Sequence, residues 1–256
     1  MFVSALVNTI DLSGSRALLN RVREQLYQHQ ILFFHVPKCA GTSLSHAFRV
    51  KHAFSQFRLD EETSRQVVDP ADLDRWMAYK QGLFLYHALQ GVRFVQGHVH
   101  YDPASFGSLH GRATFMTILR EPIDRVISLY HFDRRANEQP FGQFLETHRG
   151  RLECSILSRL FGGLPFSAEA PGVQHRDQAI EALRRFDIAG IIEKPEALSA
   201  LVKQRTGLHA HLPRRNVGKS RLANPHTVSL SDRERLRELC AVDSEIYQAV
   251  SRFQGG

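Results

Sequence analysis

The sequence has few cysteines and lacks any long hydrophobic run. Its three cysteines, Cys39, Cys154 and Cys240, are too few and too scattered for a disulfide-stabilised fold or a cysteine-rich zinc site. No apolar stretch approaches the roughly 20 residues that a membrane-spanning helix requires. Residues 1–15 lack the basic start and apolar block of a signal peptide, and no Asn-x-Ser/Thr glycosylation site occurs. We therefore expect a soluble protein of a reducing compartment, the cytoplasm.

Acidic residues are also in the minority. Lysine and arginine number 33 against 26 aspartate and glutamate residues, which gives a formal net charge of +7 and a pI of about 9.6. Both halves of the chain share this excess, so it does not form a basic tail. Hydrophobic residues make up 43% of the 256 residues, as in a folded globular protein. We expect a single domain over residues 1–256, with its core over about 31–253, that meets anions.

Short apolar runs alternate with segments of helical periodicity. The runs over 31–36, 92–99, 113–119 and 188–192 predict buried parallel strands. Helices are predicted over 15–30, 42–53, 69–89, from Glu121, and over 141–148, 152–160, 176–186, 195–206 and 231–253, the last with Ser231 as N-cap. The Gly- and Pro-rich segment 162–174 is predicted to be a surface loop. Strands separated by helices predict an α/β fold with a parallel sheet flanked by helices.

A loop of small residues follows the first predicted strand and opens a helix. Its residues are, in order, Pro37, Lys38, Cys39, Ala40, Gly41, Thr42 and Ser43. A buried strand, a tight loop and a helix N-terminus direct several backbone N–H groups at one anion. Lys38 adds a positive charge, and Thr42 and Ser43 add hydroxyl donors. The segment therefore predicts an anion-binding site.

Other interpretations of this loop differ in the residues that they require. A Walker A loop would need Gly-Lys-Ser/Thr at its end, whereas Lys38 precedes the small residues. A phosphatase-type Cys-x5-Arg loop would need arginine where Ser45 stands, which disfavours Cys39 as a catalytic thiolate. An incidental strand–turn–helix with a surface lysine stays open.

The segment from Thr117 to Tyr130 has the same strand-then-helix design. Arg120 ends the predicted strand, Pro122 starts a helix, and Ser128 lies two turns along that helix. An arginine and a serine in these positions can hold a second phosphate. Arg125 is predicted to form a surface pair with Asp124.

Together the two segments resemble the 3′-phosphoadenosine 5′-phosphosulfate (PAPS)-dependent carbohydrate sulfotransferases, especially the heparan/dermatan 2-O-sulfotransferase-like group and its bacterial relatives. In that family a Pro-Lys-x-x-x-Thr-Ser loop holds the 5′-phosphosulfate and an Arg-x7-Ser element holds the 3′-phosphate. The loop from Pro37 to Ser43, and Arg120 with Ser128, match these motifs. Weaker similarity extends to 188–194 and 242–247. The resemblance implies a P-loop nucleotide-kinase-like fold.

The family's Gly-His motif matches Gly97-His98, at the end of the second predicted strand. The carboxyl ends of parallel strands line the ligand crevice, so His98 is expected to face the same cleft as Lys38 and Arg120. Histidine suits the removal of a hydroxyl proton at neutral pH, which makes His98 the candidate base. A histidine satisfied at a strand end is the alternative, and His100 is a second candidate. The 2-O-sulfotransferase group carries another histidine at the position of Gln96.

Two further features bear on this interpretation. Residues 42–59 contain no carboxylate, so the glutamate base that other sulfotransferases carry on this helix is missing, and His46 and His52 are predicted to be surface residues. Residues 197–231 contain no acidic residue but six cations. Within them Asn216 and Lys219 match the family's loop that closes over the nucleotide. Arg214, Arg215 and Arg221 are assigned either to an anionic acceptor or to solubility.

The resemblance implies a sulfotransferase that moves a sulfuryl group from PAPS to a hydroxyl acceptor, for which a carbohydrate is expected. The product would be adenosine 3′,5′-bisphosphate, and the chemistry needs no metal. Two other functions stay open: a P-loop-like nucleotide kinase, which would need magnesium ligands, and a non-catalytic polyanion-binding module. No nucleic-acid partner is expected. Since animal relatives carry a membrane anchor, a trimmed luminal domain of a Golgi enzyme is the alternative to the cytoplasm.

Overall fold

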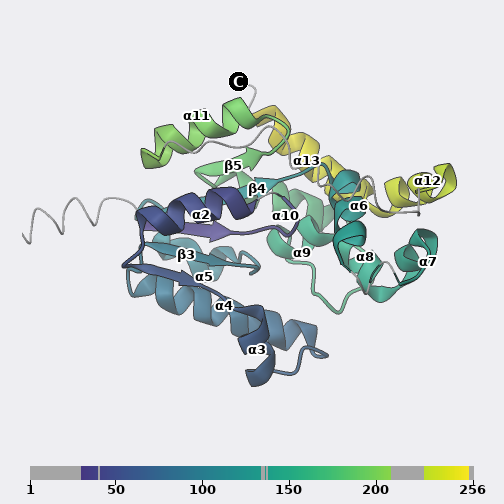
Figure 1. Cartoon of the computed structure of the whole chain (residues 1–256), viewed down its shortest axis with the longest axis horizontal. Coiled ribbons are helices and arrows are strands. Elements are labelled where there is room, and N and C mark those ends of the chain that lie inside the picture. The colour runs from purple at the N-terminus through teal and green to yellow at the C-terminus, as the bar shows by residue number, and fades with distance from the viewer. Residues whose placement is uncertain (1–29, 40, 134–135, 137, 209–227, 254–256) are drawn as a thin grey trace, which may run out of the picture.

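The computed structural model describes residues 30–39, 41–133, 136, 138–208 and 228–253 (Figure 1). The helix predicted over 15–30 lies outside them, apart from Gln30, which begins the first strand. The sheet has five strands in the order β2-β3-β1-β4-β5, and all neighbouring pairs are parallel. Their bounds are β1 Gln30–Phe34, β2 Gln56–Arg58, β3 Phe94–Gly97, β4 Ala113–Leu119 and β5 Ile188–Ile191. This sheet, flanked by helices, confirms the predicted α/β fold.

Helices connect the strands, as parallel pairing requires. They are α2 Gly41–Lys51, α3 Glu61–Val67, α4 Leu73–Leu89, α5 Pro103–Phe106, α6 Pro122–Phe132, α7 Phe141–Glu146, α8 His148–Cys154, α9 Ile156–Phe161, α10 Val173–Arg184, α11 Pro195–Thr206, α12 Leu230–Leu239 and α13 Ala241–Phe253. Figure 1 shows α4 along the β3 side of the sheet and α11 and α13 at the β5 side. Whether the chain forms one domain stays a prediction.

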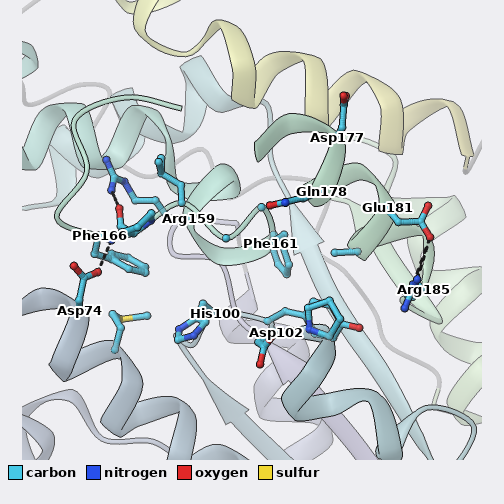
Figure 2. A pocket seen from close by; sticks show the side chains of 18 residues that line it. Asp74, His100, Asp102, Arg159, Phe161, Phe166, Asp177, Gln178, Glu181 and Arg185 are labelled. Carbon is cyan, nitrogen blue, oxygen red and sulfur yellow. Dashed lines mark hydrogen bonds and ion pairs between the residues drawn. The ribbon is translucent and has the colours of Figure 1, made fainter. Parts of the chain in front are cut away.

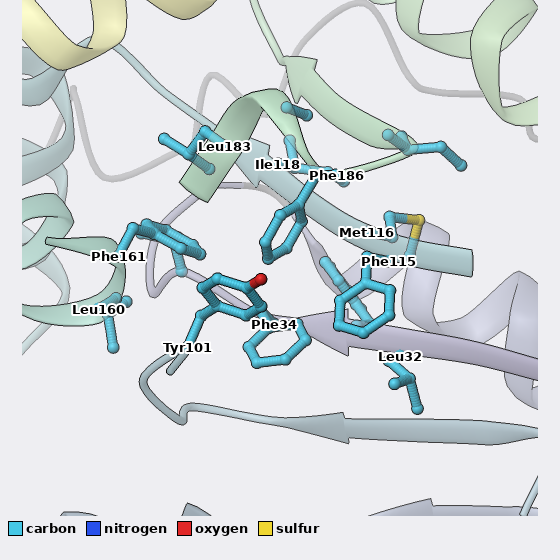
Figure 3. Close-up of a cluster of buried hydrophobic side chains, with 14 of the residues drawn as sticks. Leu32, Phe34, Tyr101, Phe115, Met116, Ile118, Leu160, Phe161, Leu183 and Phe186 are labelled. Atoms are coloured by element: carbon cyan, nitrogen blue, oxygen red, sulfur yellow. The ribbon is translucent and has the colours of Figure 1, made fainter. Parts of the chain in front are cut away.

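Aromatic side chains form much of the core around the central strands. Phe34 of β1 lies with its ring centroid 5.1 Å from that of Phe106 and 5.3 Å from that of Phe186. Figure 3 shows Phe34, Tyr101, Phe115 and Phe186 together beside β1 and β4. These four side chains are all less than 8% exposed. The burial of such large rings fixes the strands whose ends carry the candidate site.

The sequence pattern did not predict strand β2 or helices α3 and α5. Strand β2 is three residues long and has Phe57 as its single apolar residue, so no strand pattern is visible. Helix α3 is polar, and its start is set by Asp60, whose carboxylate accepts from the Thr63 N–H. The short α5, capped by Asp102, was also missed.

Several predicted helices have other bounds in the structure: the helix predicted over 176–186 begins at Val173, and the one predicted over 152–160 is divided between α8 and α9. Helix α4 begins at Leu73, because the Asp72 carboxylate caps it, and not at residue 69. The predicted helix over 231–253 is two helices, α12 and α13, divided at Cys240. Ser229, and not Ser231, is the N-cap of α12, since its hydroxyl accepts from the Asp232 N–H at 3.0 Å.

Arg125 corrects the predicted surface pair with Asp124. Its side chain is buried, at 1% exposure, and donates to a carboxylate oxygen of Glu153 at 3.0 Å and also to the Glu153 backbone oxygen. Asp124 is exposed. The apolar face of α6 turns toward α7, α8 and α12, and this carries Arg125 inward with Val126. The ion pair therefore ties α6 to α8.

Candidate functional site

The loop between β1 and α2 has a left-handed backbone at one non-glycine residue. Lys38 has a φ of +67°, a conformation that costs an L-residue of order 1–3 kcal/mol and is concentrated at functional sites. The helix that follows has no acidic residue in its first turn, so its N–H groups face no local carboxylate. Gly41, Thr42 and Ser43 form that first turn, but their side chains and all of Ala40 lie outside the described residues. The binding of an anion by this loop stays a prediction.

The Lys38 ammonium lies over an aromatic ring. Its Nζ is 3.5 Å from the centroid of the Phe132 ring, at the end of α6. Burial lowers the pKa of Lys38, and the charge of Arg120 lowers it further. The charge of Arg120 thus acts on Lys38, and a shared role of the two residues in phosphate binding stays a prediction. Phe132, which is 75% exposed, was not identified from the sequence.

Cys39 is a core residue. It is fully buried, and its thiol lies 3.7 Å from the backbone oxygen of Pro37. Burial raises the pKa of Cys39 to about 12, so the thiol stays protonated at neutral pH. This agrees with the sequence argument against a catalytic thiolate.

Arg120 and Ser128 occupy the second segment. Arg120 directly follows β4, and Ser128 lies in α6, one turn before Phe132. Both side chains are half-buried. The Glu121 carboxylate caps α6 by accepting from the Asp124 N–H at 2.8 Å, which fixes the start of the helix. A ligand beside Lys38 would therefore meet Arg120 from the end of the adjacent strand.

His98 directly follows β3, whose last residue, Gly97, is in register with Phe34 of β1. Its Nδ1 lies 2.6 Å from the backbone oxygen of His35, and its ring centroid lies 4.6 Å from that of His35. A carbonyl oxygen only accepts, so Nδ1 carries the proton and neutral His98 has its lone pair on Nε2. Burial lowers the pKa of His98, against a raising effect of this hydrogen bond. The ring is oriented and uncharged, as a base requires.

There is little room for a side chain at Gly97. A Cβ there would lie 3.2 Å from Leu59 Cβ and 3.3 Å from Phe84 Cδ2. Both contacts are tighter than ordinary van der Waals distance. Glycine therefore allows the chain to pass close to α4 before His98 turns toward His35.

A pocket of about 700 Å³ lies past the end of β3. Its lining includes His100, Asp74, Arg159 and Phe166 (Figure 2). Most of its polar groups hold the protein together: Asp74 accepts from the Phe166 N–H at 2.6 Å, and Arg159 donates to the backbone oxygens of Pro165 and Ala168. The predicted surface loop 162–174 supplies one wall.

His100 faces this pocket, whereas other candidate site residues in the described part of the chain do not line it. Neither Lys38, Arg120 nor His98 is among the residues described as lining it. The Nδ1 of His100 is buried and has no hydrogen-bond partner in the described part of the chain. Its surroundings therefore differ from those of His98, whose Nδ1 is hydrogen-bonded and whose ring contacts that of His35.

The remaining predicted residues have mixed outcomes. Asn216 and Lys219, with Arg214, Arg215 and Arg221, lie outside the described residues. His46 is exposed, as predicted, but His52 is half-buried and stacks near Phe48 and Phe94, so its prediction as a surface residue is wrong. Within residues 30–39, 41–133, 136, 138–208 and 228–253, no cluster of histidine, cysteine and carboxylate side chains could hold a metal ion. In the same ranges no helix is long and apolar enough to cross a membrane.

Comparison with known proteins bears directly on this site. A family model, described as the sulfotransferase family, matches residues 26–153, which is half of the chain. The chain belongs to the sulfotransferase family. No curated protein matches the sequence.

Membership of the sulfotransferase family indicates a transferase of sulfuryl groups and an acceptor that bears a hydroxyl. The matched residues include the β1–α2 loop, Gly97-His98 and the β4–α6 segment. They end at Glu153, so the predicted similarity of 188–194 and 242–247 stays a prediction. A nucleotide kinase and a non-catalytic module are both disfavoured by this match.

Further polar residues lie beside His98, and the sequence pattern gave none of them a role in the site. The His35 ring lies tilted against that of His98, Gln96 has its Nε2 3.2 Å from His35 Nδ1, and the Ser45 hydroxyl donates to Gln96 Oε1. A signal existed for two of them, because His35 and Gln96 interrupt apolar strand runs. Ser45 carried none, since a serine in a helix is ordinary.

Proposed function

We propose that this sulfotransferase transfers a sulfuryl group from PAPS to a hydroxyl of a carbohydrate acceptor. The observation that carries the proposal is the convergence of three strand ends. Lys38, His98 and Arg120 follow β1, β3 and β4, which are adjacent parallel strands in the sheet. Ligands bind at the carboxyl ends of such strands. An acidic first turn in α2 would have argued against an anionic donor, and α2 has none.

The β1–α2 loop is proposed to hold the 5′-phosphosulfate end of the donor. The backbone N–H groups of residues 39–42, the start of α2 and the hydroxyls of Thr42 and Ser43 are the expected donors. The aromatic ring of Phe132 holds the Lys38 ammonium beside this loop. From there Lys38 can neutralise the charge that grows on the bridging oxygen of the leaving phosphate.

Arg120 and Ser128 are proposed to hold the 3′-phosphate. Arg120 lies near enough to lower the pKa of Lys38, so one nucleotide bearing two phosphates could meet both cations. Two adjacent cations repel each other, and a dianionic ligand removes that repulsion. Asn216 and Lys219 are proposed to close over the same nucleotide.

His98 is proposed to act as the base. Its Nε2 accepts the proton of the acceptor hydroxyl while the acceptor oxygen forms its bond to sulfur. The bond between sulfur and the bridging phosphate oxygen breaks in the same in-line step, and Lys38 meets the oxygen that leaves. His98 thereby becomes an imidazolium. The hydrogen bond from its Nδ1–H to the His35 backbone oxygen stabilises this cation.

Nucleotide selectivity tests the proposal. The protein should bind adenosine 3′,5′-bisphosphate more tightly than 5′-AMP, because a charge-assisted hydrogen bond to the 3′-phosphate contributes about 1.5–3 kcal/mol. That range corresponds to about 10- to 150-fold in affinity for Arg120 alone, measured by calorimetry. Arg120→Ala should remove most of the difference.

The matched control is Arg112→Ala. Arg112 is exposed and immediately precedes β4, at the opposite end of the strand that Arg120 follows. Arg112→Ala should leave the preference for adenosine 3′,5′-bisphosphate over 5′-AMP unchanged. Equal affinities for the two nucleotides in the unmutated protein would contradict the PAPS assignment, and magnesium-dependent turnover of ATP would favour a kinase instead.

A further inference from the structure

Gln96 is a buried glutamine with both ends of its amide engaged. It is 4% exposed and immediately precedes Gly97-His98 in the chain. Its Oε1 accepts from the hydroxyl of Ser45, which is 5% exposed in α2. Its Nε2 lies 3.2 Å from Nδ1 of His35. A polar chain thus runs from α2 through β3 to the residue after β1.

The direction of these hydrogen bonds fixes the protonation of His35. Because the Gln96 oxygen faces Ser45, the amide nitrogen faces His35 and can only donate. Nδ1 of His35 must then carry the lone pair, which leaves the ring proton on Nε2. The His35 ring is therefore a neutral imidazole with a defined tautomer.

We propose that Ser45 and Gln96 are positioning residues that hold His35 as a neutral Nε2–H imidazole, so that His35 supports the base His98 with its Nε2 free to accept a proton. His35 supplies two supports to His98, a backbone oxygen 2.6 Å from Nδ1 and a tilted ring whose centroid lies 4.6 Å from that of His98. The catalytic part of this inference rests on the proposed function. The tautomers follow from the hydrogen bonds alone.

Charge explains why His35 must stay neutral. When His98 accepts a proton it becomes a cation, and a second imidazolium in contact with it would oppose that step. Burial lowers the pKa of His35 to about 3, with additional lowering by His98 and by Arg58 from β2. An amide at position 96 donates to Nδ1 without adding charge. A carboxylate there would instead accept from a protonated His35.

Other charged groups face the base from the surrounding helices. Glu61 of α3 and Glu153 of α8 favour the protonated form of His98, whereas Lys80 of α4 opposes it. Lys80 is itself paired with Glu61 at 3.0 Å. These opposing effects leave position 96 as a direct way to change the charge of the pair formed by His35 and His98.

The test is the state of the two rings, read by ¹⁵N NMR of the imidazole nitrogens in the full chain. In the unmutated protein at pH 7, His98 should show the Nδ1–H tautomer and His35 the Nε2–H tautomer. Gln96→Glu should raise the pH at which His35 titrates by more than one unit. Gln96→Met, which keeps the length but not the hydrogen bonds, should give His35 a mixture of tautomers.

Gln30→Met is the matched control. Gln30 lies at the start of β1, where its Nε2 donates to the backbone oxygens of Ala88 and Val92, far from the strand ends of the site. This variant should leave the signals of His35 and His98 unchanged. If the unmutated protein shows the Nδ1–H tautomer at His35, or if Gln96→Met leaves both rings unchanged, the inference is wrong.

Activity provides an independent arm. Gln96→Glu should lower kcat for sulfuryl transfer about 10- to 100-fold, move the acid limb of the pH–rate profile to higher pH and leave the KM for PAPS unchanged. A purely structural role would lower thermal stability and activity together without moving the acid limb, and would overturn the inference. The expected tautomers in a protein that transfers no sulfuryl group would support the tautomer assignment and contradict the proposed function.

Discussion

Removal of the Lys38 ammonium should slow sulfuryl transfer about 10²- to 10³-fold, the effect of losing one donor that acts in the transition state. Lys38→Ala should change the affinity for adenosine 3′,5′-bisphosphate much less. The reason is that Lys38 meets a charge that develops only as the bridging bond breaks, whereas Arg120 and Ser128 hold the nucleotide in both states.

The structure indicates that the ammonium is free to make this contact. Its present partner is the Phe132 ring, 3.5 Å from Nζ, and Phe132 is 75% exposed. A cation–π contact at an exposed site contributes about 0.5–1 kcal/mol. A charge-assisted hydrogen bond to the leaving oxygen contributes about 1.5–3 kcal/mol. Transfer of Nζ from the ring to that oxygen is therefore favourable by about 0.5–2.5 kcal/mol.

Backbone strain requires its own control in this experiment. Because Lys38 has a φ of +67°, Lys38→Ala keeps the strained backbone, whereas Lys38→Gly relieves it. Both variants should lose the same factor in rate, while the glycine variant should be more stable by about 1 kcal/mol. Lys203→Ala, at an exposed position of α11, should change neither quantity.

Single-turnover transfer of label from PAPS measures the chemical step, and calorimetry with adenosine 3′,5′-bisphosphate measures binding. Equal losses in rate and binding for Lys38→Ala would show that Lys38 only binds the nucleotide and does not stabilise the transition state. If Lys38→Gly restored the transfer rate, the backbone conformation at this position, and not the charge of Lys38, would determine the rate.

Three further predictions concern the residues that support the site. Arg125→Ala should lower the free energy of unfolding by about 3–5 kcal/mol in urea denaturation, because it leaves Glu153 with a partly buried charge and no ion-pair partner; Glu153→Gln in the same background should recover part of the loss. Asp243→Ala should lower it by about 2–4 kcal/mol, since the buried carboxylate accepts from two backbone N–H groups and one hydroxyl at the start of α9, and an unchanged urea midpoint would contradict this. Burial gives His35 a pKa of about 3 in the folded protein, against 6.5 in the unfolded chain, so the unfolded chain binds a proton there more readily. Protonation of His35 therefore does not affect the free energy of unfolding above pH 6.5, and lowers it by up to about 1.4 kcal/mol per pH unit as pH falls below 6.5. His35→Gln should make the fall in stability between pH 6.5 and 4 shallower, and a steeper fall would contradict the assignment.

Apolar periodicity was enough to predict the elements that carry the site. The strand 113–119 matches β4, and the helix 195–206 matches α11, because both have buried apolar faces and clear start signals at their ends. The strand end at Arg120 and the position of His98 then follow from topology alone. For this reason Lys38, His98 and Arg120 could be placed at one edge of the sheet before the structure was known.

Contacts between distant segments could not be predicted in the same way. Arg125 looked like a surface residue because its neighbour Asp124 offers a partner in the sequence, whereas its actual partner, Glu153, lies 28 residues away. Gln96 likewise looked like a departure from the family pattern. Its role became visible only when β1, β3 and α2 brought His35 and Ser45 to its two ends.

The most direct measurement of the central claim is transfer of ³⁵S from labelled PAPS to a panel of glycans and lipids, with no divalent metal added. We expect labelled product from a glycan, with loss of about 10²- to 10⁴-fold in His98→Ala, the usual contribution of a positioned base. That variant should retain its affinity for adenosine 3′,5′-bisphosphate, since His98 follows a different strand from Lys38 and Arg120. Full activity in His98→Ala would contradict the role of His98 as base, and the absence of transfer from PAPS to any member of the panel would contradict the proposed function.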